Sequence, residues 1–234
     1  IGELAQLAGW VASDAGHYPD AQRLYLSGVT AAEAAGDRAL GAQLLSSLAY
    51  QITNVGRRED ALLIARSAVT GAPDASPLVR ALMLERLAWA AARLRDTDTT
   101  RRALDAVNDA YDQRSDGAAE PEWVYWLNRA EIDVMAARCL IELGTPAAAE
   151  PLLTRALAAY NPDHAREVAL YQTWLAEGHV RAGDLDAARE VLARIDTTAI
   201  DAGSSRLQRR VTAVDRLIDR RAQKKPATSR QPTE

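Results

Sequence analysis

The fold is decided by residues 45–68, which read LSSLAYQITNVGRREDALLIARSA. Apolar residues recur at i, i+3, i+4 and i+7 from Leu45 to Ile52, a spacing that places them on one face of a helix. Gly56 is expected to end this helix, because glycine tolerates the positive φ that helix ends commonly need. After four charged residues the same spacing resumes over 61–68. The stretch therefore predicts an antiparallel helical hairpin whose two apolar faces are buried against each other.

The same pattern recurs along the chain at a regular interval. In each unit a small residue is followed seven positions later by a turn residue. At four of the five turns, an alanine stands five positions after the turn residue. The turns are Gly16, Gly56, Arg95, Gly144 and Gly183, and the small residues before them are Gly9, Ala49, Ala88, Ala137 and Ala176. Neighbouring turns lie 39 or 40 residues apart, except for 49 residues between Arg95 and Gly144. A period of about 40 residues with two helices per unit is typical of a helical solenoid.

We therefore predict an all-α, right-handed solenoid of five helical hairpins over residues 1–222. The repeats are expected near 1–36, 38–71, 76–112, 122–160 and 163–196, with a C-terminal capping helix at 204–222. The fourth repeat is expected to begin near Glu122 with a long helix that holds Trp123 and Trp126. Residues 223–234 contain no large apolar side chain, so we expect them to be disordered.

Three stretches resemble a known family. They are LAQLAGWVASDAGHYPDAQRLY (4–25), GDRALGAQLLSSLAYQITNVGRREDALLIARSA (36–68) and PEWVYWLNRAEIDVMAARCLIELGTPAAAEPLL (121–153). The small residue, turn glycine and following alanine resemble the tetratricopeptide (TPR) pattern. The whole phrases resemble the C-terminal TPR-like domain of actinobacterial transcription regulators that carry an N-terminal helix-turn-helix. The resemblance runs from about Leu4 to about Glu190 and implies a domain that senses a ligand or partner.

Composition and charge narrow the possible environments and partners. Alanine is abundant and phenylalanine is absent, which favours helices over strands. The single cysteine, Cys139, suits a reducing compartment, and no apolar run is long enough to span a membrane, so we expect a cytoplasmic protein. The net charge of −4 divides into +6 from Arg206 onward and −10 before it. An acidic body argues against specific DNA binding by this chain alone.

No pattern of catalytic or metal-binding residues is present in the sequence. There is no glycine-rich phosphate loop after a strand pattern, and the three histidines lack metal-ligand spacing. We therefore predict no catalytic residue, no metal and no cofactor, and we expect that the protein is not an enzyme.

The remaining candidate is a binding surface on the first helix of each hairpin, which lines the concave face of a TPR-type array. The position after each small residue, together with the position one turn later, is expected to point into this groove. The predicted ligand-binding residues are Trp10, Tyr50, Asn54, Trp89, Arg93, Arg138 and Glu177. They are expected to bind a peptide, a small molecule or a protein, because aromatic rings offer large contact areas and arginine fixes carboxylates.

Two alternatives stay open for these residues. A tryptophan at helical spacing can be core packing, and Arg93, Arg138 and Glu177 can bridge one another across the groove. If Trp89 belongs to a ligand surface, Trp89→Ala is expected to leave stability nearly intact and to abolish binding. If it is packing, the same change is expected to cost about 3–5 kcal/mol.

Two functions are consistent with the sequence. In the first, which the resemblance implies, the chain is the sensor or effector domain of a transcription regulator. Because the sequence starts at Ile1 and shows no helix-turn-helix of its own, we expect a domain of a longer protein that reaches DNA only through a missing N-terminal domain. In the second, the chain is a free-standing TPR adaptor between proteins. A homodimer is compatible with either function.

Overall fold

The computed structural model of the protein describes residues 1–115, 119–161, 164–195 and 205–224. Within these ranges the chain forms eleven α-helices and one short 3-10 helix, and no strand. The predicted all-α class is confirmed. The expected start of the capping helix at residue 204 lies outside the described residues, and so do residues 225–234 of the tail expected from 223 onward, whereas residues 223 and 224 belong to the last helix.

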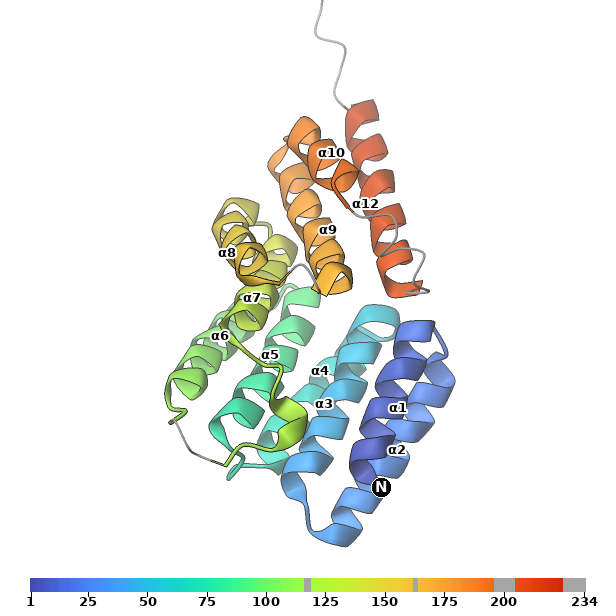
Figure 1. Ribbon diagram of the computed structural model, residues 1–234, viewed down its shortest axis with the longest axis vertical. Helices are drawn as coiled ribbons and strands as arrows, with labels where there is room; N and C mark the ends of the chain where they lie inside the picture. Colours follow the sequence, from blue (N-terminus) through green and yellow to red (C-terminus); the bar gives the residue numbers. More distant parts are fainter. Residues whose placement is uncertain (116–118, 162–163, 196–204, 225–234) are drawn as a thin grey trace, which may run out of the picture.

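Ten of the helices pack as consecutive hairpins, as the sequence predicts (Figure 1). The pairs are α1 (Gly2–Ala15) with α2 (Tyr18–Ala35), α3 (Arg38–Val55) with α4 (Arg58–Gly71), α5 (Pro77–Arg93) with α6 (Thr97–Asp112), α7 (Arg129–Leu143) with α8 (Pro146–Ala159), and α9 (Ala165–Ala182) with α10 (Leu185–Ala193). Four of them, α3, α6, α7 and α10, begin at an Asp or Asn side chain that accepts a hydrogen bond from a backbone N–H of the first turn. Such caps are a common reason for a helix to start where it does.

The turn residues behave as predicted at three of the five hairpins. Gly16, Gly144 and Gly183 have φ of 92°, 86° and 95°, the left-handed conformation expected after a helix. Gly56 also ends α3, as expected, but without a positive φ: its φ is −125°, and the chain leaves the helix in an extended conformation. Arg95, which replaces glycine in the third hairpin, takes a positive φ of 60° instead.

The expected long helix at the start of the fourth repeat is also absent. Residues Glu122–Val124 form a single 3-10 turn, η1, and α7 begins only at Arg129. The reason is local: the Asn128 side chain accepts a hydrogen bond of 3.1 Å from the Glu131 backbone N–H and so fixes the helix start. In the preceding segment the Trp126 indole N–H donates to the Trp123 carbonyl at 3.0 Å, which closes a compact turn.

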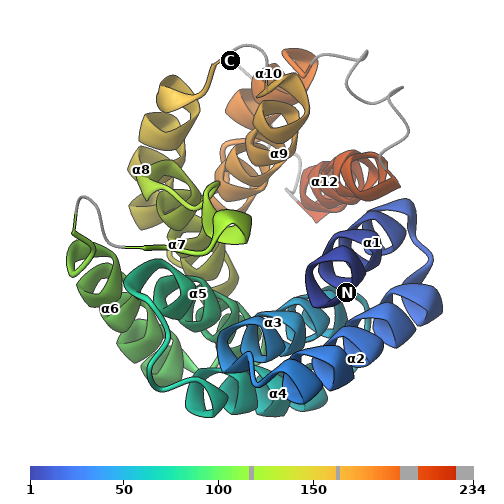
Figure 2. The same cartoon turned by 60° about the horizontal axis from the view of Figure 1, so that its bottom comes forward.

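The hairpins form two layers. The first helices α1, α3, α5, α7 and α9 contact one another in succession and form the inner row, while their partners lie outside (Figure 2). The small residues of the repeat lie where paired helices approach closely. A Cβ atom on Gly9 would come within 2.5 Å of the buried ring of Tyr25, and Ala49 and Ala137 are fully buried.

The last helix, α12 (Ser205–Lys224), covers one end of the array and also reaches the other. Val214 and Ile218 pack with Val180 and Val191, which covers the apolar face of α9 and α10. The same helix contacts α1, so the first and last elements lie side by side (Figure 2). The inner row and α12 together therefore surround a central space. None of the described helices is both long enough and apolar enough to cross a membrane.

Candidate functional site

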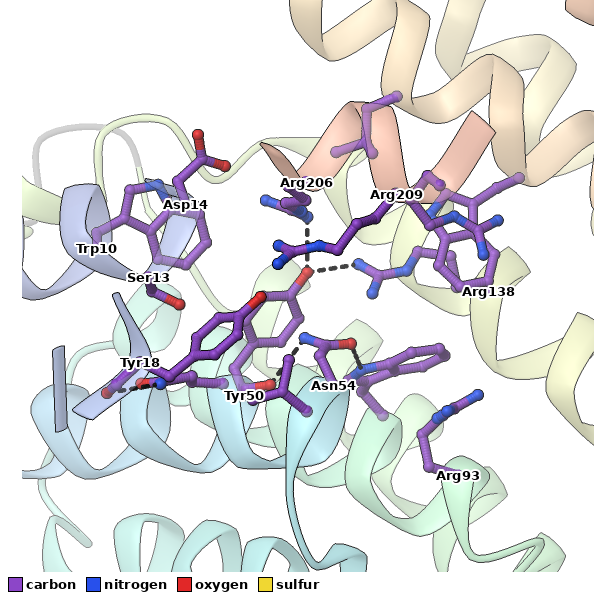
Figure 3. A pocket seen from close by; sticks show the side chains of 16 residues that line it. Trp10, Ser13, Asp14, Tyr18, Tyr50, Asn54, Arg93, Arg138, Arg206 and Arg209 are labelled. Atoms are coloured by element: carbon purple, nitrogen blue, oxygen red, sulfur yellow. Dashed lines mark hydrogen bonds between the residues drawn. The ribbon is translucent and has the colours of Figure 1, made fainter. Parts of the chain in front are cut away.

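A cavity of about 390 Å³ lies where the inner row meets α12 (Figure 3). Its walls come from α1, α3, α5, α7, α9 and α12 and from Tyr18 at the start of α2. Six of the seven sequence-predicted residues line it, namely Trp10, Tyr50, Asn54, Trp89, Arg93 and Arg138. The seventh, Glu177, lies behind the wall, where it binds Arg210. Trp10 and Arg138, which are 128 positions apart in the sequence, thus line the same cavity.

Two pairs of aromatic rings form much of the wall. The ring of Trp10 stacks on that of Tyr50, with centroids 5.8 Å apart and an interplanar angle of 18°. Deeper in, Trp89 meets Trp174 of α9 edge to face, with centroids 5.5 Å apart. The Trp89 indole N–H donates a 3.1 Å hydrogen bond to the Asn54 side-chain oxygen, which fixes the orientation of both groups.

The burial of these rings bears on the two alternatives for Trp89. Trp89 is only 1% exposed and Tyr50 only 5%, and both belong to the main apolar core. Trp89 therefore supports the deep wall and cannot be removed without loss of packing. This burial favours the alternative in which Trp89 is core packing, although the residue does border the cavity.

Arg138 occupies the deep end of the cavity in an aromatic surrounding. Its guanidinium carbon lies 4.3 Å from the ring centroid of Trp89 and 4.7 Å from that of Trp174. One of its terminal nitrogens, Nη1, donates a 3.0 Å hydrogen bond to the Tyr50 hydroxyl oxygen. The residue is 4% exposed, so its charge is held away from water. Contacts with ring faces stabilise such a cation but do not neutralise it.

Arg206 of α12 reaches the same hydroxyl from the other side. Its Nη2 donates to the Tyr50 oxygen at 2.7 Å (Figure 3). Burial by itself raises the pKa of Tyr50, but the nearby charges of Arg138, Arg206 and Arg86 lower it to about 7. Two guanidinium groups therefore share one phenol oxygen, and this oxygen carries partial negative charge near neutral pH.

Of the other charged residues predicted for the site, Arg93 and Glu177 form ion pairs, but not with each other or with Arg138. Arg93 forms an ion pair with Glu142, and Glu177 binds Arg181 at 2.6 Å and Arg210 at 2.8 Å. No ion pair joins Arg93, Arg138 and Glu177 among the described residues, so the alternative in which these three bridge one another does not hold. The Glu177 group instead holds α12 against α9.

Sequence reasoning missed the contribution of α12. Arg206, Arg209 and Arg210 all line the cavity, whereas the sequence indicated only that the chain is basic from Arg206 onward. The available signal was the position of these arginines on a helix whose other face carries regularly spaced apolar residues. Trp174 was missed because it lies two positions before the small residue of its repeat, outside the register that located Trp10, Tyr50 and Trp89.

In the described ranges, no cluster of three or more His, Cys, Asp and Glu side chains is placed to hold a metal ion. No protein-family model matches the sequence, and no curated protein matches it significantly.

Proposed function

We propose that the protein is a ligand-sensing domain of a transcription regulator, built as a right-handed TPR-like solenoid, and that its ligand occupies the central cavity. The observation that carries the proposal is the cavity itself. It has the volume of a small-molecule site, about 390 Å³, and its walls combine aromatic rings with a few precisely held polar groups. The resemblance of three stretches to actinobacterial regulators supports the link to transcription. DNA would be contacted through a separate helix-turn-helix domain.

The position of α12 suggests how such a domain would signal. Arg206 and Arg210 come from the last helix, Trp10 comes from the first, and all three line the cavity. A second contact between the two ends is the ion pair of Arg166 in α9 with Asp14 in α1. A ligand that touches both ends of the array changes how firmly they are held together. A ligand shifts a conformational equilibrium when it binds one conformation more tightly than the other, and contacts with both ends of the array would give it this difference.

Native mass spectrometry of the protein purified from its own host tests the proposal. The wild-type protein is expected to carry a mass excess that corresponds to one small molecule and disappears on denaturation. Ser13→Trp places an indole in the cavity mouth, where Ser13 contributes to the wall, and is expected to remove this excess. Ser67→Trp, on the exposed side of α4, is the matched control and is expected to keep it. An equal mass excess in all three proteins, or none in the wild type, would contradict the proposal.

One observation favours the adaptor function as a second candidate. The side chains of Leu4, Leu7 and Val11 on α1 follow the spacing i, i+3 and i+7 and are 71%, 58% and 59% exposed. An exposed apolar stripe of this kind is typical of a protein contact. If the protein is an adaptor, a Leu4→Glu and Leu7→Glu double variant is expected to abolish its function while Ser13→Trp has no effect.

A further inference from the structure

The polar atoms without partners gather at one place in the molecule. In the part of the chain that the structure describes, four buried side-chain polar atoms lack a hydrogen-bond partner, and all four belong to residues that line the cavity. They are the Tyr18 hydroxyl, the Gln51 side-chain oxygen, and the Nε groups of Arg93 and Arg138. Gln51 and Arg138 are 2% and 4% exposed. Buried polar groups almost always have partners, so this concentration indicates a site for a polar ligand.

The cavity also has more positive than negative charge. Among the described residues, no carboxylate lies within ion-pair distance of Arg138, Arg206 or Arg209. The nearby carboxylates are committed elsewhere: Glu142 pairs with Arg93, Glu177 with Arg181 and Arg210, and Asp14 with Arg166. Asp14 and Glu131 still act on Arg206 from a distance, and Tyr50 supplies at most one negative charge between two guanidinium groups.

The carboxyl group of Glu85 does not neutralise the excess positive charge at the cavity. Its side chain is almost completely buried on α5, near Arg86 and Arg138. Burial raises the pKa of Glu85 to about 8, even though both arginines act to lower it. At neutral pH most of this carboxyl group is therefore protonated and uncharged. A buried cation that lacks a counter-ion is unfavourable, and an entering anion would relieve this at Arg138.

The apolar residues of the cavity wall indicate the shape of the uncharged part of the ligand. Leu170 and the rings of Trp10, Tyr18 and Trp174 line the cavity around the arginines. The ring of Trp174 also has Arg210 over its face, with the guanidinium carbon 3.6 Å from the centroid. Flat aromatic walls pack best against a flat apolar group, and a cavity of about 390 Å³ has room for a small molecule rather than a folded partner.

We propose that the cavity binds a small organic anion, an acid group on a flat apolar body, with the acid group placed between Arg138 and Arg206. The guanidinium groups would donate charge-assisted hydrogen bonds to the acid, since their planar fork suits both carboxylate and phosphate. The Tyr18 hydroxyl and the Gln51 oxygen would bind a further polar substituent. This inference rests on the proposed ligand-sensing function and names the class of ligand.

Isothermal titration calorimetry with three naphthalene compounds tests the inference. Naphthoate and naphthyl phosphate carry the two kinds of acid group, and naphthalenemethanol is their uncharged counterpart. We expect both anions to bind at least about tenfold more tightly than the alcohol, and the tighter of the two identifies the preferred acid. Arg138→Met and Arg206→Met are each expected to weaken anion binding by about ten- to a hundredfold and to leave the alcohol nearly unaffected.

The controls separate this inference from the proposed function. Arg216→Met, on the exposed face of α12, is expected to bind the anions as the wild type does, and circular dichroism shows whether each variant is folded. Equal binding of the alcohol and the anions, unchanged in Arg206→Met, would overturn the anion inference and leave a cavity that binds neutral ligands. Absence of binding by all three compounds would also overturn it, and the mass-spectrometric result would still decide the proposed function.

Discussion

Replacing Trp89 with alanine is expected to lower the free energy of unfolding by about 3–5 kcal/mol. The side chain is 1% exposed, meets Trp174 edge to face, and donates a hydrogen bond to Asn54. Its removal leaves a hole at the centre of the main core and deprives Arg138 of one of the rings around its charge. Both effects act in the same direction, so the loss belongs to the upper part of the range for large core residues.

Urea unfolding followed by far-ultraviolet circular dichroism measures this loss. Tyr125→Ala is the matched control, because the Tyr125 side chain is 85% exposed and its removal is expected to change stability by no more than about 0.5 kcal/mol. A loss below about 1 kcal/mol for Trp89→Ala would show that the deep wall of the cavity is not packed as described.

Tyr50 is expected to titrate near neutral pH in the folded protein. Its hydroxyl oxygen accepts hydrogen bonds from Arg138 and Arg206, and their charges together with that of Arg86 lower the pKa from 10.0 to about 7 despite the opposing effect of burial. A pH titration followed by the near-ultraviolet absorbance of phenolate should show a step of one tyrosine with a midpoint near pH 7. Tyr50→Phe should abolish the step.

The lowered pKa also predicts how stability depends on pH. Because the folded state favours the ionised phenol, the contribution of this group is complete above the unfolded pKa of 10.0 and is lost as the pH falls through about 7. The difference in unfolding free energy between wild type and Tyr50→Phe should therefore grow from pH 7 to pH 10.

Tyr160→Phe is the control for the titration. Burial and the hydrogen bond to Glu131 raise the pKa of Tyr160, so the Tyr160 hydroxyl does not ionise near pH 7. Removing this hydroxyl should therefore leave the absorbance step near pH 7 unchanged. If the wild-type protein shows no phenolate absorbance until the pH approaches 10, the two arginines do not hold the phenol oxygen as described.

The sequence predicted the inner wall of the site because that wall follows from repetition. Tyr50, Trp89 and Arg138 occupy one register position in three consecutive units, and stacking places equivalent positions of neighbouring repeats side by side. The register of the repeats is visible in the sequence without any knowledge of long-range contacts. It extends to Trp10, which faces the same cavity from α1.

The outer wall could not be predicted in the same way. The apolar pattern of α12 indicates which face is buried, and Leu207 and Val214 are indeed almost completely buried. No local pattern shows that its other face meets α1, because that contact depends on the accumulated curvature of five hairpins. For the same reason Glu177, although in register, faces Arg210 of α12 rather than the cavity. The break before α7 was missed because the cap at Asn128 competes with a longer helix.

The central claim is that the cavity between the inner row and α12 is the ligand site. A crystal structure of the protein with bound naphthoate tests it most directly. We expect density for the carboxylate within hydrogen-bonding distance of Arg138 and Arg206, and for the naphthalene rings between Trp10 and Trp174. Naphthoate bound instead along the exposed stripe of Leu4 and Leu7, with no density for it in the cavity, would show that the cavity is not the ligand site.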